Sequence, residues 1–93
     1  WLHQLMSGEL IMLWSSFGVG GYTVGIARSI SGEILGPWQQ LSDPLYAGDG
    51  GHCMVFQTFD VKLHLALHRP NTSPYERPFF LHSLYNRVMV KAV

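Results

Sequence analysis

Apolar residues in this chain gather into short runs separated by glycine, proline and polar residues, a pattern typical of β-strands joined by turns. Residues 4–14 and 57–67 each show a strand, a short polar turn and a second strand rich in apolar residues, at an offset of 53 residues. A strand pair that recurs about every 40 to 50 residues is characteristic of propeller blades. The pattern therefore predicts two similar β-units in succession, although the two copies share few identical residues.

Further strands are expected between and after the two hairpins, and turn residues bound each of them. The expected segments are 21–28, 36–40, 52–56, 62–68, 79–81 and 85–93. Pro37 is tolerated at the start of a short edge strand because such a strand need not donate every N–H. No long helix is expected, since glycine, proline and β-branched residues interrupt each stretch. The chain is thus predicted to be all-β, either as propeller blades or as a small independent sandwich or barrel.

The composition narrows the class of protein. Of the 93 residues, 47% are hydrophobic and only 13% are charged, which argues against disorder and suggests apolar faces that need a partner. The six basic residues balance the six acidic ones and are scattered, so a nucleic-acid partner is not expected. No apolar run approaches the roughly 20 residues of a membrane span, and no signal peptide is visible, so no membrane partner is expected and the compartment stays open. The single cysteine, Cys53, excludes an internal disulfide.

Three groups of segments carry a resemblance to a known family. They are 10–17 with 21–29 and 36–38; 44–46 with 49–52 and 54–56; and 65–71 with 76–78. In order and spacing they resemble the last two blades of glycoside hydrolase family 43, a family of five-bladed β-propellers. The resemblance runs from residue 1 to about residue 84. It implies two antiparallel blades of an incomplete propeller: residues 1–47 as blade four without its start, and residues 48–93 as blade five and a C-terminal strand.

The sequence departs from the family at two positions. Cys53 stands where the family usually has glycine, and the hairpin at 60–62 contains Val61 where the family favours glycine. A two-residue hairpin requires positive φ, which is costly for a β-branched residue. Either this turn is longer than two residues, or the second unit is less stable than its relatives.

The resemblance implies inverting hydrolysis of arabinose- or xylose-containing glycans, a reaction that needs a carboxylic acid and a carboxylate base. In the family these groups and a third, tuning carboxylate come from earlier positions, and the acid is expected just before Trp1. The chain is therefore expected to be a hydrolase fragment that is inactive alone, and whether it is an enzyme stays open. Its own carboxylates are expected in solvated turns, with Glu76 paired to Arg77 or a nearby backbone group: Glu9, Glu33, Asp49, Asp60 and Glu76.

His52 is the site residue that the resemblance carries over. It matches a histidine that the family places at the floor of the central pocket, facing substrate-bound water or a cation such as calcium; a buried structural histidine is the alternative. No cofactor is otherwise required. Antiparallel hairpins place the end of one strand beside the start of its partner, which brings further residues to the same rim. The expected substrate-pocket residues are Trp14, Ser15, Ser16, Gly51, His52, His68 and Arg69.

Some of these assignments have competing interpretations. Trp14 can equally be part of the core between blades, and His3, His64 and His82 are expected to be ordinary strand residues. Cys53 has no base nearby in sequence and is not expected to act as a nucleophile. The expected partners are an oligo- or polysaccharide together with the missing blades or a second copy of the chain. A non-catalytic β-module that binds carbohydrate or self-assembles, and an unrelated small β-domain with its own ligand, remain as alternatives.

Overall fold

The computed structural model describes residues 1–60, 62–84 and 87–92, which form eight strands and no helix. The first sheet contains β1 (Leu2–Gln4), β2 (Leu10–Gly18), β3 (Gly21–Ser29) and β4 (Trp38–Gln40). The second sheet contains β5 (Gly51–Gln57), β6 (Leu63–Arg69), β7 (Arg77–Leu84) and β8 (Arg87–Ala92). In each sheet the strands are antiparallel and follow the order of the sequence.

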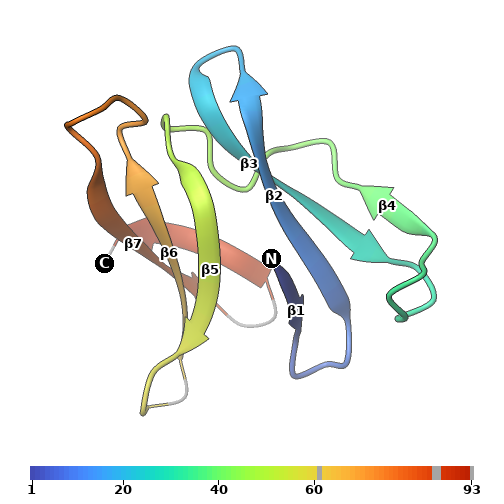
Figure 1. Cartoon of the computed structure of the whole chain (residues 1–93). Coiled ribbons are helices and arrows are strands. Elements are labelled where there is room, and N and C mark those ends of the chain that lie inside the picture. The colour runs from blue at the N-terminus through green and yellow to red at the C-terminus, as the bar shows by residue number, and fades with distance from the viewer. Residues whose placement is uncertain (61, 85–86, 93) are drawn as a thin grey trace.

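The all-β prediction with two antiparallel four-stranded units is confirmed (Figure 1). The expected outer strand at 85–93 is present as β8, although residues 85, 86 and 93 lie outside the described residues.

The two sheets differ in how tightly their hairpins turn. β2 and β3 pair along their full length to Gly18 and Gly21, so their turn is short. β5 and β6 pair as far as Gln57 and Leu63, and residues 58–62 form the connection between them. Of the two alternatives left open for this hairpin, a longer turn or a less stable unit, the structure has the longer turn. Val61 itself lies outside the described residues.

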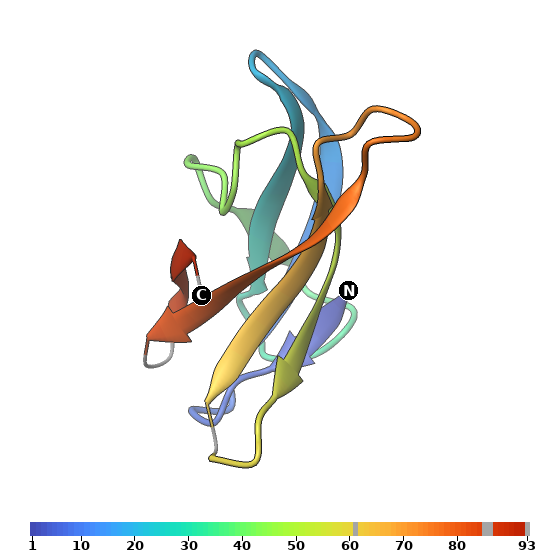
Figure 2. The same ribbon diagram turned by 90° about the vertical axis from the view of Figure 1, so that its left-hand side faces the viewer.

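The core lies between the sheets. β5 is the strand of the second sheet that contacts both β2 and β3 of the first, whereas β4 lies on the far side of the first sheet from this junction (Figure 1; Figure 2 shows the same arrangement from the side). Strand alternation sends every second residue of β2 into the junction, so that Ile11 and Leu13 are buried. Across from them, Leu65 and Leu67 of β6 are buried in the same cluster. Burying side chains of this size stabilises a fold by about 1.5 to 3 kcal/mol each.

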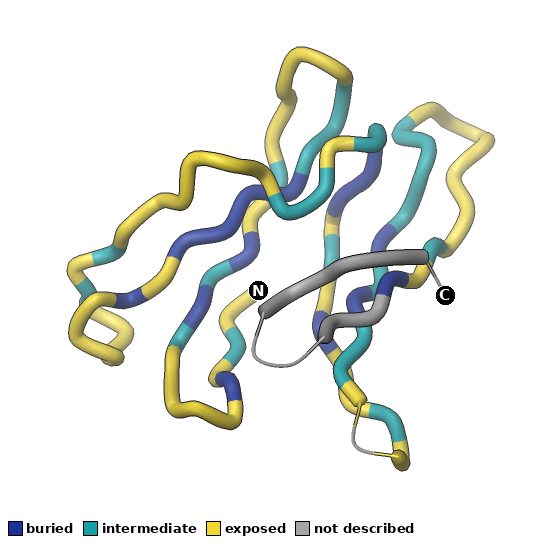
Figure 3. Tube along the Cα trace, turned by 180° about the vertical axis from the view of Figure 1, so that it is seen from behind, coloured by how far each residue is buried: buried dark blue, intermediate teal, exposed yellow. Residues whose placement is uncertain are grey.

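The outward faces of the sheets carry large apolar side chains that the described chain leaves partly exposed. Trp14 is 41% exposed on the first sheet, and Met54, Phe56 and Phe80 are 44%, 37% and 43% exposed on the second. In Figure 3, buried positions run along the central strands, whereas the loops are mostly exposed. Each sheet therefore has one covered face and one open apolar face.

The segment that joins the sheets belongs to the same junction. After β4 the chain returns along β3, where the N–H of Val24 donates to the carbonyl of Tyr46 and the N–H of Leu45 donates to the carbonyl of Val24. The N–H of Gly50 then donates to the carbonyl of Tyr22, at 2.9 Å, immediately before β5 begins. These bonds deliver the first residues of β5 to the end of the β2–β3 hairpin. No helix in the described part has the length and apolar character needed to cross a membrane.

Candidate functional site

The candidate site is a rim formed where β5 begins, β6 ends and the β2–β3 hairpin turns, at the upper end of Figure 1. The register pairs Gly51 of β5 with His68 of β6. The centroids of the His52 and His68 imidazole rings lie 6.4 Å apart, and the rings meet edge to face. The N–H of His52 donates to Oγ of Ser15, at 2.9 Å, so the rim is bonded across the two sheets. We call Ser15, Tyr22, His52, His68 and Asn71 the rim cluster.

Gly51 permits the sheets to approach one another at this point. A Cβ on Gly51 would come 2.5 Å from the Tyr22 ring and 2.9 Å from Oγ of Ser15, and both distances are too short for real contacts. The need for a residue without a side chain at this position thus arises from contact with the neighbouring sheet. His52 follows with a φ of 53°, in the left-handed region that non-glycine residues seldom adopt.

Tyr22 and Asn71 are members of the rim that the sequence analysis missed. The ring of Tyr22 stacks on that of His68, with 5.6 Å between centroids and 26° between planes. Oδ1 of Asn71 lies 2.8 Å from Nε2 of His68. Because an amide oxygen only accepts hydrogen bonds, this contact places a ring proton on Nε2, and in the neutral ring Nδ1 of His68 is then an acceptor. The pairing of Tyr22 with Phe17 across the hairpin is the signal that could have placed Tyr22 at this end.

Asp49 corrects an expectation, because its carboxylate is not merely solvated in a turn. Oδ1 accepts the N–H of Tyr22 at 3.0 Å, and Oδ2 accepts the N–H of Asn71 at 3.2 Å. The hydrogen bond from Tyr22, followed by the one from Asn71, holds the pKa of Asp49 below its usual value. The Arg69 cation acts in the same direction, as does His68 when its ring is protonated. The carboxylate therefore joins the start of β3 in the first sheet to the β6–β7 loop of the second.

The structure separates the seven expected pocket residues. Ser15, Gly51, His52 and His68 meet at the rim. Arg69 points away from them, as its Nε donates to the carbonyl of Gly48 and its guanidinium lies 5.3 Å from the centre of the Phe79 ring.

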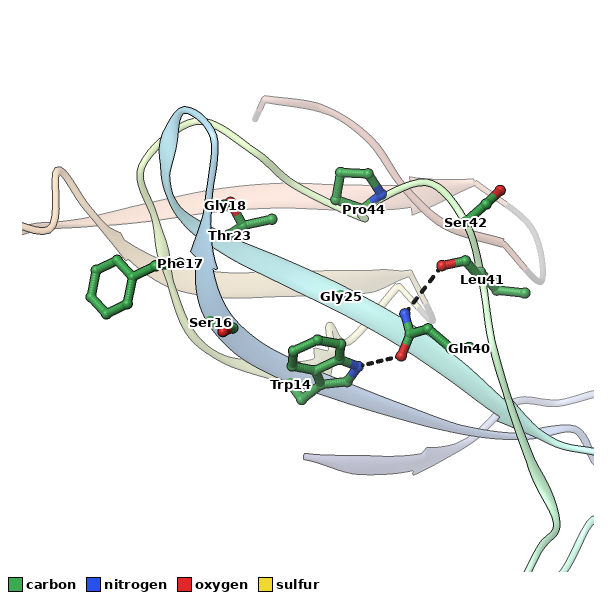
Figure 4. Close-up of a pocket in the computed structure, with 10 residues that line it drawn as sticks. All are labelled: Trp14, Ser16, Phe17, Gly18, Thr23, Gly25, Gln40, Leu41, Ser42 and Pro44. Carbon is green, nitrogen blue, oxygen red and sulfur yellow. Dashed lines mark hydrogen bonds between the residues drawn. The ribbon is translucent and has the colours of Figure 1, made fainter.

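Trp14 and Ser16 lie on the opposite face of β2 from Ser15, because side chains alternate along a strand. There they line a separate pocket of about 350 Å3 on the outward face of the first sheet (Figure 4). The indole of Trp14 lies against Gly25, and its Nε1 donates to Oε1 of Gln40 at 2.8 Å. Trp14 and Ser16 are therefore not part of the rim in this chain.

A second pocket, also about 350 Å3, opens beside the rim histidines. Met54, Ala66, Leu67 and Pro78 provide apolar surface, and His52, His68, Glu76 and Arg77 provide polar groups. The guanidinium of Arg77 donates to the backbone carbonyl of Glu76, at 2.9 Å. A pocket with two imidazoles and one guanidinium suits a polyhydroxylated ligand, since a neutral imidazole can both donate to and accept from hydroxyls and a guanidinium donates to them.

The remaining titratable residues do not assemble a catalytic pair within the described chain. Glu9 and Asp60 lie at the hairpin turns opposite the rim, and Asp60 accepts from Thr58 and pairs with Lys62 at 3.7 Å (Figure 1). Glu33 lies in the loop between β3 and β4. Burial raises the pKa of the Cys53 thiol, which disfavours the thiolate that a nucleophile needs.

The described residues do not form a metal centre by themselves. Among them, no group of three or more histidine, cysteine, aspartate or glutamate side chains is placed to hold an ion. Calcium takes six to eight oxygen ligands, so His52 and its neighbours fall short of that set.

Comparison with known proteins gives one informative match. No family model and no curated protein sequence matches this chain. The solved structure of an endo-arabinase from Bacteroides thetaiotaomicron VPI-5482 superimposes with a TM-score of 0.83 at 42% sequence identity. The match covers 94% of this chain and 31% of that enzyme, so this chain spans less than a third of the enzyme's length. The chain thus shares the fold of one part of an endo-arabinase.

Proposed function

We propose that this chain is part of a glycoside hydrolase of family 43 that acts on arabinose-containing polysaccharide. In this proposal the two sheets are the fourth and fifth blades of a five-bladed propeller. The observation that carries it is the match to an endo-arabinase, at 42% identity over 94% of the chain. Identity at that level over almost the whole chain is hard to reconcile with an unrelated small β-domain.

The open apolar faces support the same proposal. Trp14 is exposed on one outward face, and Met54, Phe56 and Phe80 are exposed on the other. Apolar area of this kind is normally covered, and further blades on each side would cover both faces at once. In a closed wheel the innermost strands lie nearest the axis, so β5 and the rim cluster would face the shared pocket.

The role of this chain in the reaction is to bind and orient the sugar. The described carboxylates form no acid–base pair, whereas Ser15, His52 and His68 present hydroxyl and imidazole groups at one edge. Inverting hydrolysis requires an acid and a base on opposite faces of the sugar. We expect both to come from other parts of the complete enzyme, and the isolated chain to be inactive.

Reconstitution tests this proposal. The chain is mixed with the complementary portion of the Bacteroides endo-arabinase, and hydrolysis of linear arabinan is measured with each part alone as control. We expect activity from the mixture only. In the mixture, His52→Ala should lower kcat/KM about 10- to 100-fold, the value of one or two hydrogen bonds, whereas Asp60→Asn should leave it unchanged. A stable complex without activity on arabinan would refute the assignment of substrate.

A non-catalytic, self-assembling module is the second candidate, and the same open faces favour it. If copies of the chain cover one another, sedimentation at micromolar concentration should show an oligomer. Charged substitution of Phe56 should then dissociate that oligomer. A monomer that binds the complementary enzyme portion would exclude this candidate.

A further inference from the structure

Asp49 occupies an unusual position between the two sheets. Its backbone has a φ of 61°, and its two carboxylate oxygens accept hydrogen bonds from different elements. One bond comes from the N–H of Tyr22, which is 27 residues away at the start of β3; the other comes from Asn71, 22 residues away in the β6–β7 loop. A single side chain thus links the start of β3 in the first sheet to the β6–β7 loop of the second.

The two residues that Asp49 holds both contact His68. The Tyr22 ring stacks on the His68 ring at 5.6 Å, and the Asn71 amide oxygen lies 2.8 Å from its Nε2. Asp49 holds these residues by their backbones, which leaves both side chains directed at the imidazole. The orientation of the His68 ring is therefore set from two sides by residues that share one anchor.

Gly21 shows that the carboxylate has a dedicated space. A Cβ on Gly21 would lie 2.6 Å from Oδ1 of Asp49 and 3.1 Å from its Cγ, and the φ of Gly21 is +114°. Gly8 has a similar φ of +93° in the β1–β2 turn, but nothing lies within 4 Å of the position of its Cβ. The two glycines therefore both have a positive φ and differ in whether a carboxylate lies beside them.

We propose that Asp49 is a positioning residue for sugar recognition: through Tyr22 and Asn71 it fixes the His68 imidazole with its proton on Nε2 and with Nδ1 as an acceptor for a sugar hydroxyl. The recognition step rests on the proposed function, whereas the positioning step does not. His68 lines the pocket that also contains His52, Glu76 and Arg77, where a hydroxyl could be bound.

The electrostatics of the carboxylate agree with this role. The hydrogen bonds from Tyr22 and Asn71 lower the pKa of Asp49, and the Arg69 cation of β6 adds to this effect, as does His68 when its ring is protonated. Because the pKa in the folded state is depressed, the contacts are intact above the ordinary aspartate value of 3.8 and are lost as the pH falls through the lowered value.

The experiment is NMR spectroscopy of the 93-residue chain. The nitrogen and ring-proton shifts of His68 report the protonated nitrogen and the stacking of Tyr22. Asp49→Asn keeps the shape but removes one acceptor oxygen, and Gly21→Ala displaces the carboxylate without deleting it. Gly8→Ala and Asp60→Asn are the matched controls. Both test variants should move the His68 signals in the same direction, and neither control should.

The wild-type chain supplies a measurement that needs no variant to fold. On acidification, the amide protons of Tyr22 and Asn71 should shift together, with a midpoint below 3.8. Separate midpoints, or unchanged His68 signals in a folded Asp49→Asn chain, would overturn the positioning role. If the signals move but arabino-oligosaccharide binds the wild type and Asp49→Asn equally well, the recognition step is wrong and the positioning step stands. We expect binding to weaken about 3- to 10-fold in the variant, as for one neutral hydrogen bond.

Discussion

The two ends of this molecule are built differently. At the rim, bonds cross between the sheets: His52 to Ser15, and Asp49 to both Tyr22 and Asn71. At the opposite end, the hairpin turns bond within themselves, as when Thr58 contacts Lys62. The rim therefore holds a fixed geometry between sheets, whereas each turn at the far end closes only its own hairpin. We expect a binding site at the rim, where hydrogen bonds between the sheets hold the side chains in place, because recognition depends on fixed geometry.

The largest expected effect comes from the core that supports both ends. Leu65 is 1% exposed and lies in the cluster between the sheets. Leu65→Ala should lower the free energy of unfolding by about 2 to 5 kcal/mol, through lost burial and the cavity left behind. Urea denaturation measures this change. A smaller loss with both ends intact would show that the sheets are stable without their shared core.

Gly51→Ala should act next most strongly, and at the rim. The new methyl group would press on the Tyr22 ring and on Ser15, so overpacking should lower stability by about 1 to 3 kcal/mol. Gly20→Ala is the control, because its nearest neighbour, the carbonyl oxygen of Ala47, is 3.7 Å away, an ordinary contact. Equal thermal midpoints for the two variants would contradict close contact of the sheets at Gly51.

Ser15→Ala removes the hydrogen bond that His52 donates across the sheets. The expected loss is about 0.5 to 1.5 kcal/mol, as for other single hydrogen bonds. Amide exchange localises the effect, because the N–H of His52 should exchange faster in the variant. Unchanged exchange at His52 would mean that this bond does not join the sheets in solution.

Acid should weaken the rim through Asp49. Its lowered pKa means that its contribution is complete above 3.8 and declines as the pH falls through the depressed value. Unfolding measured between about pH 5 and pH 2 should therefore show a smaller loss of stability in Asp49→Asn than in the wild type. Identical pH profiles would show that the carboxylate does not hold the rim.

The smallest effect is expected at the far end. Asp60 is bonded to Thr58 and pairs with Lys62 at the surface, where such pairs contribute little. Asp60→Asn should leave the unfolding midpoint and the His68 signals unchanged. A change in the His68 signals would show that the two ends are coupled and that the far-end turns do more than close their own hairpins.

Much of the fold could be predicted from local patterns. Runs of apolar residues bounded by glycine, proline and polar turns located the strands, because strand and turn preferences act over a few residues. For the β5–β6 hairpin, Val61 left two alternatives, a longer turn or a less stable unit, because it does not suit a two-residue hairpin; the structure has the longer turn. The separation of Ser15 from Trp14 and Ser16 was available too, because neighbouring residues of a strand point to opposite faces.

The site was predicted less completely, because its contacts join distant parts of the chain. The placement of His52 beside His68 came from hairpin geometry, which is local to one sheet. The bonds from Asp49 to Tyr22 and Asn71 span 27 and 22 residues, and no local pattern specifies them.

The sequence alone determined an all-β chain in two units, since alternation and turn chemistry depend on near neighbours. Only the tertiary structure decided which faces meet, which loops Asp49 connects and why Gly51 must lack a side chain. Those outcomes depend on how one sheet packs against the other, and packing is set by shape and distance in space rather than by order along the chain.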